Sequence, residues 1–228
     1  LVILDDNFET IAAAVEEGRQ IMNNIRKVLV YLLSSVADEL LLIIGSLLAG
    51  IALPFNALQI LWINFFSDSF PAVAFAFEKN IDGFSRHSSG NKTGLFSPLM
   101  KSLILFRGGL MSAFLFLLYW ILLRVGFQED LVRTFIFASF GTYSLLLAFP
   151  VRNLNKGIFK YPVFSNHYLV LGVSIGVVLM AAAIYLPFLQ SILKTVALSP
   201  YWLLGVVLIG ILNIATMELG KWMFGRRQ

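Results

Sequence analysis

Long stretches without charge are the feature that most constrains what this chain can fold into. Residues 108–123, 134–151, 161–193 and 195–217 contain no Asp, Glu, Lys or Arg. A helix needs about 20 mainly apolar residues to cross the hydrocarbon core of a membrane, and these stretches approach or exceed that length. The pattern therefore predicts a protein that spans a membrane several times.

The composition agrees with this reading and excludes other classes. Of the 228 residues, 58% are hydrophobic and 13% are charged, whereas soluble domains carry about 25% charged residues. A disordered chain, a soluble enzyme and a nucleic-acid-binding protein are all excluded, despite the net charge of +4. Cysteine is absent and the only histidines are His87 and His167, which argues against a disulfide framework, a thiolate or histidine metal site and a Ser-His-Asp relay.

Two further apolar stretches, 28–53 and 54–77, contain only three charged residues: Asp38, Glu39 and Asp68. Spans are then expected near 28–50, 56–77, 100–123, 131–151, 167–187 and 200–222. All must be helices, because lipid offers no partner to unpaired backbone groups. The predicted fold class is an all-α membrane protein, a six-transmembrane-helix bundle.

The basic residues predict the orientation of this bundle. An even number of spans puts both termini on one side, and that side receives fourteen of the seventeen Lys and Arg residues, Arg107 included. Only Arg124, Arg133 and Lys194 fall on the other side. By the positive-inside rule both termini are expected to be cytoplasmic. The net positive charge is then explained by the orientation in the membrane and by contact with anionic lipid. No nucleic-acid partner is expected.

Residues 1–27 have a different, amphipathic pattern. Asp6 and Glu9 form a capping-box signature for the start of a helix. The following apolar residues recur every three or four positions: Phe8, Ile11, Val15, Gly18, Met22, Ile25 and Leu29. The pattern favours a cytoplasmic stalk helix that runs into the first span, with a helix lying on the membrane surface as the alternative. We expect a stalk over 1–27 and a transport domain over 28–228, together the C-terminal piece of a longer protein.

Carboxylates inside a span are costly and usually serve function. Asn64, Ser67, Asp68 and Pro71 are spaced to share one helical face. Pro71 has no N–H, so the carbonyl of Ser67 loses its usual helical partner. This face offers amide, hydroxyl, carboxylate and carbonyl oxygens, which suit Ca²⁺ or a similar hard cation.

Glu39 on the neighbouring helix could add another oxygen, with Ser35 one turn before it. The candidates supply five or six of the six to eight oxygens that Ca²⁺ usually takes, so water or another segment must complete the shell. The alternative is an interhelical polar clamp without a cation. Glu218 is expected to be a snorkelling carboxylate beside Lys221.

Two segments resemble type II P-type ATPases of the calcium-pump kind. Residues 4–11 (LDDNFETI) with 14–19 (AVEEGR) are similar to the junction after the phosphorylation domain, which leads into a stalk helix in that family. Residues 61–72 (LWINFFSDSFPA) resemble the calcium-pump motif L-W-V-N-L-V-T-D-G-L-P-A. The resemblance implies that the whole chain is the C-terminal half of a transport domain.

Carried over by position, the resemblance makes Asn64, Ser67, Asp68 and Glu39 the metal ligands. Val36 stands where two-site calcium pumps have an asparagine ligand. The fourth span also lacks their glutamate and offers only hydroxyl-bearing residues, namely Ser139, Thr142, Tyr143 and Ser144. These departures imply about one ion per cycle.

The resemblance further implies export of Ca²⁺ from the cytoplasm, driven by ATP and Mg²⁺ on upstream phosphorylation, nucleotide-binding and actuator domains. No catalytic residue is expected within this chain, since it contains no D-K-T-G-T phosphorylation motif, G-D-G-x-N-D hinge or phosphate-binding loop. The loop 78–98 would contact the phosphorylation domain. Gly172 and Gly176 form a small-xxx-small pair that predicts close helix packing.

Other functions stay open at this point. A secondary transporter or channel could use Asp68 and Glu39 to relay protons or Na⁺, although the internal repeat expected of such proteins is not evident. A membrane scaffold without transport would tolerate neutralisation of Asp68. Among transported ions, Mn²⁺, Na⁺ and H⁺ remain alternatives to Ca²⁺.

Overall fold

The computed structural model describes residues 8–78 and 96–225, and within them all regular structure is helical. Six helical segments are long and apolar enough to cross a membrane. They coincide with the six spans expected from the sequence, which confirms the all-α fold class. The predicted capping box at Asp6 and most of the loop 78–98 lie outside the described residues.

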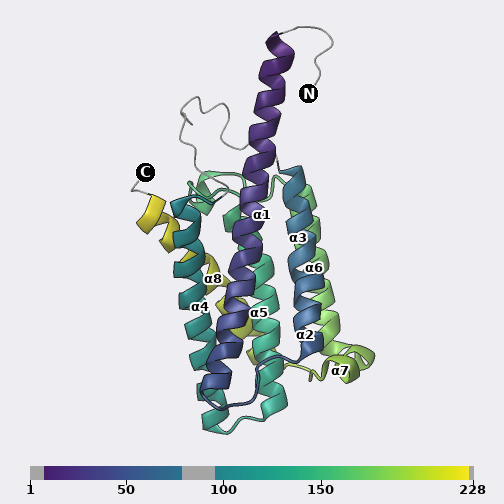
Figure 1. Ribbon diagram of the computed structural model, residues 1–228. Coiled ribbons are helices and arrows are strands. Elements are labelled where there is room, and N and C mark those ends of the chain that lie inside the picture. Colours follow the sequence, from purple (N-terminus) through teal and green to yellow (C-terminus); the bar gives the residue numbers. More distant parts are fainter. Residues whose placement is uncertain (1–7, 79–95, 226–228) are drawn as a thin grey trace.

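Helix α1 (Phe8–Leu48) is one continuous helix of 41 residues. At 1.5 Å per residue it is about 60 Å long, roughly twice the thickness of the hydrocarbon core. Its N-terminal part extends beyond the other helices (Figure 1), and we call that side of the bundle the stalk end. The continuity agrees with the expected stalk, while the domain boundary at residue 27 stays a prediction.

The second span is divided into four helical pieces where a single regular helix was expected. It begins with α2 (Ala57–Trp62), continues as a π-helix, η1 (Ile63–Asp68), and ends as α3 (Ser69–Ala74) and the 3₁₀ turn η2 (Phe75–Phe77). Asn56 starts α2 with a reciprocal capping box. The Asn56 side chain accepts a hydrogen bond from the backbone N–H of Gln59, and the Gln59 side chain accepts one from the backbone N–H of Asn56. The π-helix holds the segment richest in candidate ligands.

Four more spans follow: α4 (Pro98–Val125), α5 (Glu129–Val151), α6 (His167–Tyr185) and α8 (Pro200–Gly225). The turn η3 (Ile158–Lys160) lies between α5 and α6. The fifth span was expected to reach residue 187 but ends at Tyr185, because Pro187 favours an extended residue before it. Pro187 instead starts a short helix, α7 (Pro187–Leu193), which the sequence analysis missed.

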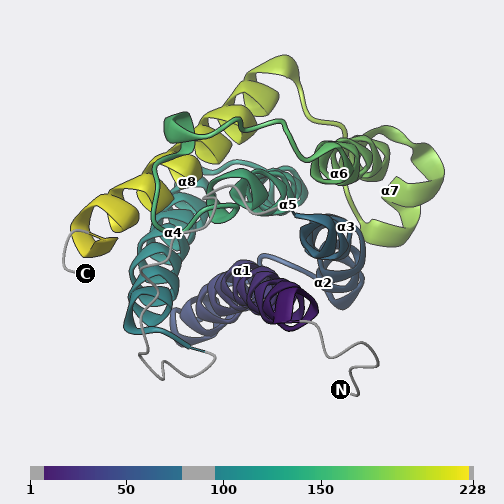
Figure 2. The same ribbon diagram turned by 90° about the horizontal axis from the view of Figure 1, so that it is seen from above.

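Helix α5 lies at the centre of the bundle, with α1, α4, α8, α6 and α3 around it (Figure 2). It is the most completely buried of the six spans. Glycines allow close approach to it, since a Cβ on Gly176 of α6 would lie 2.3 Å from the Leu145 side chain of α5. A Cβ on Gly172 would lie 3.1 Å from the Phe70 carbonyl oxygen of α3. The predicted close packing of this glycine pair is confirmed.

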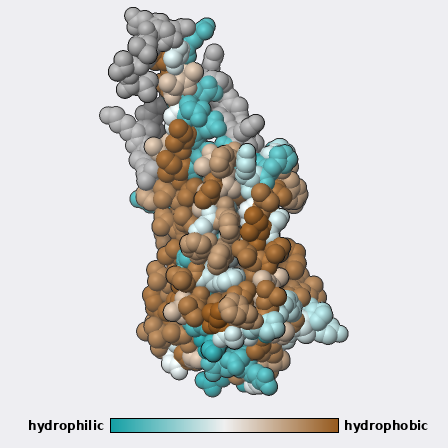
Figure 3. Space-filling model, turned by 90° about the vertical axis from the view of Figure 1, so that its right-hand side faces the viewer, coloured by the Kyte–Doolittle hydropathy of each residue, from teal (hydrophilic) through white to brown (hydrophobic). Residues whose placement is uncertain are grey.

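The outer faces of the spans carry apolar side chains. Leu105 of α4 and Leu208 of α8 are 75% and 56% exposed, respectively, and the side of the molecule in Figure 3 is largely covered by hydrophobic residues between more hydrophilic ends. Apolar side chains on this outer surface suit contact with lipid. Charged side chains that face the interior of such a bundle usually serve a function.

Candidate cation site

Asp68 lies at the junction of α1, α5 and the second span. Its carboxylate is 2% exposed and accepts hydrogen bonds from two serines, one at 2.7 Å from the Ser35 hydroxyl of α1 and one from the Ser144 hydroxyl of α5. The two hydroxyl oxygens are themselves 3.1 Å apart. Three oxygen-bearing side chains from three segments therefore meet at one buried point.

Glu39 and Asn64 form the second part of the site. The Asn64 amide nitrogen donates to the Glu39 carboxylate at 3.2 Å and to the Ile60 carbonyl at 2.9 Å. Glu39 is 7% exposed, so this carboxylate is also held inside the bundle. The bonds use the amide nitrogen of Asn64 and leave its amide oxygen as the atom suited to a hard cation.

Ser67 contributes an unpaired hydroxyl. Its Oγ is buried and has no hydrogen-bond partner among the described residues. A Cβ on Gly141 of α5 would lie 3.2 Å from this oxygen, so the glycine makes room for the hydroxyl. A buried polar group without a partner costs about 1–3 kcal/mol. That cost would be removed if the hydroxyl coordinated a cation.

The Ser67 carbonyl, which Pro71 cannot pair in a regular helix, accepts a hydrogen bond of 3.1 Å from the Tyr31 hydroxyl of α1. Tyr31 is fully buried and packs edge-to-face on Phe75. The carbonyl expected to be free thus has a protein partner. The π-helix at this point also departs from the regular helical spacing used in the sequence analysis, and such turns are frequent at functional sites.

The predicted ligands lie in two separate contacts of the second span with its neighbouring helices. Asp68 contacts Ser35 of α1 and Ser144 of α5, so Ser35 pairs with Asp68 instead of supporting Glu39. Asn64 contacts Glu39 of α1, and the Ser67 hydroxyl lies beside Gly141 of α5. In the described part of the chain no three His, Cys, Asp or Glu side chains form a metal-binding group. Two carboxylates with amide and hydroxyl oxygens remain, and their role as ligands stays a prediction.

The hydroxyl-bearing residues of α5 that were expected near the site do not share one partner. Ser144 reaches Asp68 and Tyr143 reaches Asp38, whereas the buried hydroxyl of Ser139 has no partner among the described residues. Val36, at the position of a missing asparagine ligand, is 41% exposed.

A buried ion pair next to this site was missed by the sequence analysis. Arg107 of α4 lies 2.6 Å from the Asp38 carboxylate of α1, and both side chains are 0% exposed. Arg107 was counted among the basic residues of the cytoplasmic side, but it is the tenth residue of α4 and its side chain is buried in the bundle. Without it thirteen basic residues face three, so the asymmetry behind the predicted orientation persists.

A second buried cluster links the helices at the stalk end. Glu78 follows η2, and its backbone carbonyl accepts from the Gln20 and Asn24 side chains of α1 at 3.1 and 2.9 Å. Its carboxylate accepts from Arg152 at 2.7 Å and from Asn166 at 2.7 Å. We call Gln20, Asn24, Glu78, Arg152 and Asn166 the stalk-end cluster. It joins α1, the second span and the loop between α5 and α6.

Arg152 is held from several directions. Besides Glu78 it donates to the Pro162 carbonyl at 2.9 Å, to the Val163 carbonyl and to the Ser165 hydroxyl at 2.8 Å. Tyr161 lies under its guanidinium and donates to a carbonyl of α5 at 2.8 Å. Burial raises the pKa of Tyr161 above its ordinary value of about 10, so this phenol keeps the proton that it donates.

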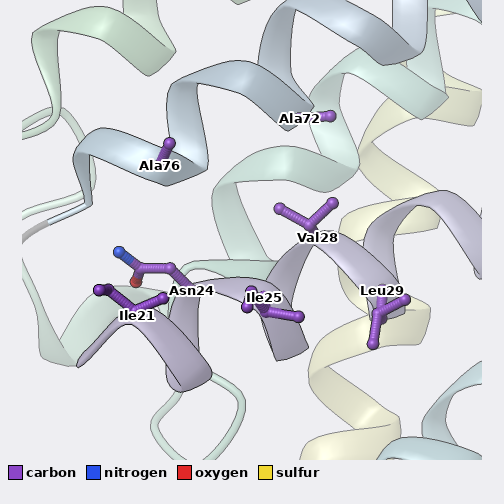
Figure 4. A pocket seen from close by; sticks show the side chains of 7 residues that line it. All are labelled: Ile21, Asn24, Ile25, Val28, Leu29, Ala72 and Ala76. Atoms are coloured by element: carbon purple, nitrogen blue, oxygen red, sulfur yellow. The ribbon is translucent and has the colours of Figure 1, made fainter. Parts of the chain in front are cut away.

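Two other features at the stalk end have no ion-binding chemistry. Glu218 and Lys221 form an ion pair of 2.6 Å, as expected, and Glu218 also accepts from the Ile158 N–H at 3.0 Å. A groove of about 290 Å³ between α1 and the end of the second span is lined by apolar side chains and Asn24 (Figure 4). Its lining excludes it as the cation site.

Comparisons with known proteins agree with a bundle that spans a membrane. The family profile described as "Cation transporting ATPase, C-terminus" matches residues 52–223. The chain belongs to this family. It is similar to the Calcium-transporting ATPase of Bacillus subtilis (strain 168), with 34% identity over 232 residues that cover 100% of this chain and 26% of the relative.

Further relatives are similar over most of the chain. The Calcium-transporting ATPase 1 of Bacillus cereus (strain ATCC 10987 / NRS 248) is 31% identical, covering 97% of this chain and 27% of its own length. The Calcium-transporting ATPase 1 of Yarrowia lipolytica (strain CLIB 122 / E 150) is 30% identical over 92% of this chain and 23% of its own length. The chain therefore spans about a quarter of the length of these curated relatives.

Proposed function

We propose that this chain is the ion-binding membrane part of an ATP-driven pump that exports Ca²⁺ from the cytoplasm, about one ion per cycle. The observation that carries the proposal is the burial of two carboxylates, Asp68 and Glu39, between α1 and the second span. Asn64 is bonded to Glu39, and the residue before Asp68, Ser67, has a buried hydroxyl without a partner among the described residues. These are hard oxygen donors of the kind that Ca²⁺ prefers. Membership of the cation-transporting ATPase family favours a pump over the secondary transporter considered from the sequence.

The charge balance supports one divalent ion. Asp68 and Glu39 bring two negative charges, while Asp38 is paired with Arg107, Glu78 with Arg152 and Glu218 with Lys221. One Ca²⁺ would neutralise these two carboxylates, which have no ion-pair partner among the described residues. A singly charged ion would leave a net charge buried in the bundle, which is costly.

The stalk-end cluster gives a route from ATP to the ion. In the proposed pump, upstream phosphorylation, nucleotide-binding and actuator domains use ATP and Mg²⁺ and move the stalk over residues 1–27. Gln20 and Asn24 bind the Glu78 carbonyl, ten residues after Asp68 on the same span. A shift of α1 would therefore move η1 relative to Ser35 and Ser144 and change the shell around the ion.

The ligands must lose the ion on the far side of the membrane. Because the carboxylates bind Ca²⁺ in their ionised form, protonation of Asp68 and Glu39 after separation from Ser35 and Asn64 would favour release and bring protons back. Both chain termini are proposed to face the cytoplasm, where the basic residues at the stalk end contact anionic lipid.

Inside-out vesicles containing the full-length protein test this function. We expect ATP-dependent uptake of Ca²⁺ that a Ca²⁺ ionophore releases, and its loss in Asp68→Asn. The matched control is Asp130→Asn, an exposed aspartate in the first turn of α5, which should transport normally. Equal uptake by wild type and Asp68→Asn would refute the assigned site, and an absence of ATP-dependent uptake by wild type would refute the pump.

A further inference from the structure

The Asp38–Arg107 pair is an unusual use of charge in a membrane bundle. The Arg107 guanidinium and the Asp38 carboxylate are 2.6 Å apart and fully buried. Removing both charges from water is expensive, and a buried pair is often no more stabilising than an apolar pair of the same size. Charged residues inside a membrane usually serve a function, so the pair calls for one.

The surroundings of the guanidinium are those of a cation site. Besides Asp38, the Asn213 amide oxygen of α8 accepts from Arg107 Nε at 2.8 Å. The Asn213 amide nitrogen donates to the Tyr143 carbonyl at 2.9 Å, which fixes the amide with its oxygen toward Arg107. The Tyr143 ring lies 5.2 Å from the guanidinium carbon, within the range of a cation–π contact.

Asp38 has further hydroxyl neighbours. Ser112 of α4 donates to one carboxylate oxygen at 3.2 Å, and the Tyr143 hydroxyl of α5 donates to the other at 3.1 Å. A carboxylate, an amide oxygen and two hydroxyls are therefore gathered from α1, α4, α5 and α8. The same atoms could surround a small inorganic cation if the guanidinium were absent.

The guanidinium itself fits this pocket incompletely. Its Nη2 atom is buried and has no hydrogen-bond partner among the described residues. A polar clamp whose purpose is stability is expected to satisfy all its donors. The positive charge of Arg107, more than its hydrogen bonding, is then what the pocket uses.

This pocket adjoins the proposed ion site. Asp38 directly precedes Glu39 in α1, and Tyr143 directly precedes Ser144, which donates to Asp68. Asp38, Glu39 and Asp68 together carry three negative charges when ionised. The positive charge of Arg107 reduces their sum to two negative charges, which one divalent cation balances. The number of ions that the bundle can hold thus depends on Arg107.

We propose that the Arg107 guanidinium fills, as a covalently held cation, a second cation pocket centred on Asp38, and thereby restricts the bundle to one transported ion. The inference rests on the proposed function for its consequence, the number of ions per cycle. The pocket itself is defined by Asp38, Ser112, Tyr143 and Asn213. If the arginine is truncated, a singly charged inorganic cation such as Na⁺ takes its place.

The test uses purified full-length protein without ATP and compares NaCl with choline chloride at equal concentration. We expect Arg107→Ala to bind roughly one radioactive sodium ion per molecule, because one buried carboxylate has lost its counter-charge, and to unfold at a higher temperature in NaCl than in choline chloride. Wild type should show neither effect. Arg124→Ala, which removes an exposed arginine from the far end of α4, is the matched control.

A double variant, Arg107→Ala with Asp38→Asn, removes both charges and should fold without sodium and bind none. Sodium binding by this double variant equal to that of Arg107→Ala would overturn the proposal. So would a folded Arg107→Ala that binds no sodium, or an Arg107→Ala that fails to fold even in NaCl. Failure of the proposed function is read separately, since it appears as an absence of Ca²⁺ binding in wild type.

Discussion

Replacement of Arg152 by methionine should destabilise the stalk end strongly. The change keeps a long side chain but removes the guanidinium that donates to the Glu78 carboxylate, to two carbonyls and to Ser165. Arg152 and Glu78 are each only 1% exposed at the side chain, so water cannot replace the lost partner. Breaking such a buried pair from one side costs about 3–5 kcal/mol.

The contacts of Glu78 narrow the expected loss of stability further. After Arg152→Met the Glu78 carboxylate would still accept the 2.7 Å hydrogen bond from Asn166, which places the expected cost near the lower limit, about 3 kcal/mol. Replacing both residues, Arg152→Met with Glu78→Met, removes the stranded charge. We therefore expect the double variant to be more stable than Arg152→Met alone, because two apolar side chains need no partner.

The assay is the apparent unfolding temperature of full-length protein in detergent, measured at one heating rate because such unfolding is usually irreversible. Arg124→Met is the control, since Arg124 is exposed and lies over the Trp120 ring at 5.4 Å. Its unfolding temperature should stay close to that of wild type, because exposed substitutions usually change the stability by no more than about 0.5 kcal/mol. An unfolding temperature of Arg152→Met equal to that of Arg124→Met, or a double variant less stable than Arg152→Met, would show that Arg152 does not stabilise the stalk end by pairing with Glu78.

Three further outcomes follow from single contacts. Ser67→Ala should weaken Ca²⁺ binding without lowering the unfolding temperature, because the hydroxyl has no protein partner to lose; a large loss of stability with unchanged affinity would contradict its role as a ligand. Gly176→Ala should cost about 1–3 kcal/mol through overpacking, while Gly109→Ala, where a Cβ meets nothing within 4 Å, should not destabilise; equal unfolding temperatures would contradict this. Asn24→Ala should lower Ca²⁺ transported per ATP hydrolysed, because it removes a 2.9 Å bond between the stalk and Glu78; an unchanged ratio would argue against this route.

The sequence predicts the spans well because lipid imposes one strong rule. Apolar stretches of the required length can only become helices in a membrane, and all six were found. Asp68 was identified by the same rule, since a carboxylate surrounded by apolar residues must turn inward. Its burial, and that of Glu39, agrees with this expectation.

What the sequence did not predict depends on contacts between distant segments. Arg107 stands next to a charge-free stretch and was counted only as a basic residue of one membrane side, although Asp38, Asn213 and Tyr143 hold it inside the bundle. The π-helix at 63–68 was missed because a regular period was assumed. Ser35 was paired with Glu39 by spacing along one helix, while Asp68 on another span proved to be its partner.

Asp68 and Glu39 are proposed to hold one Ca²⁺ between the second span and its neighbouring helices. Equilibrium binding of radioactive calcium to purified full-length protein tests it most directly. We predict roughly one ion per molecule in wild type and in Asp130→Asn, and none in Asp68→Asn at the same free Ca²⁺, because one divalent ion balances two carboxylates. Undiminished binding by Asp68→Asn, or two ions per wild-type molecule, would contradict the account.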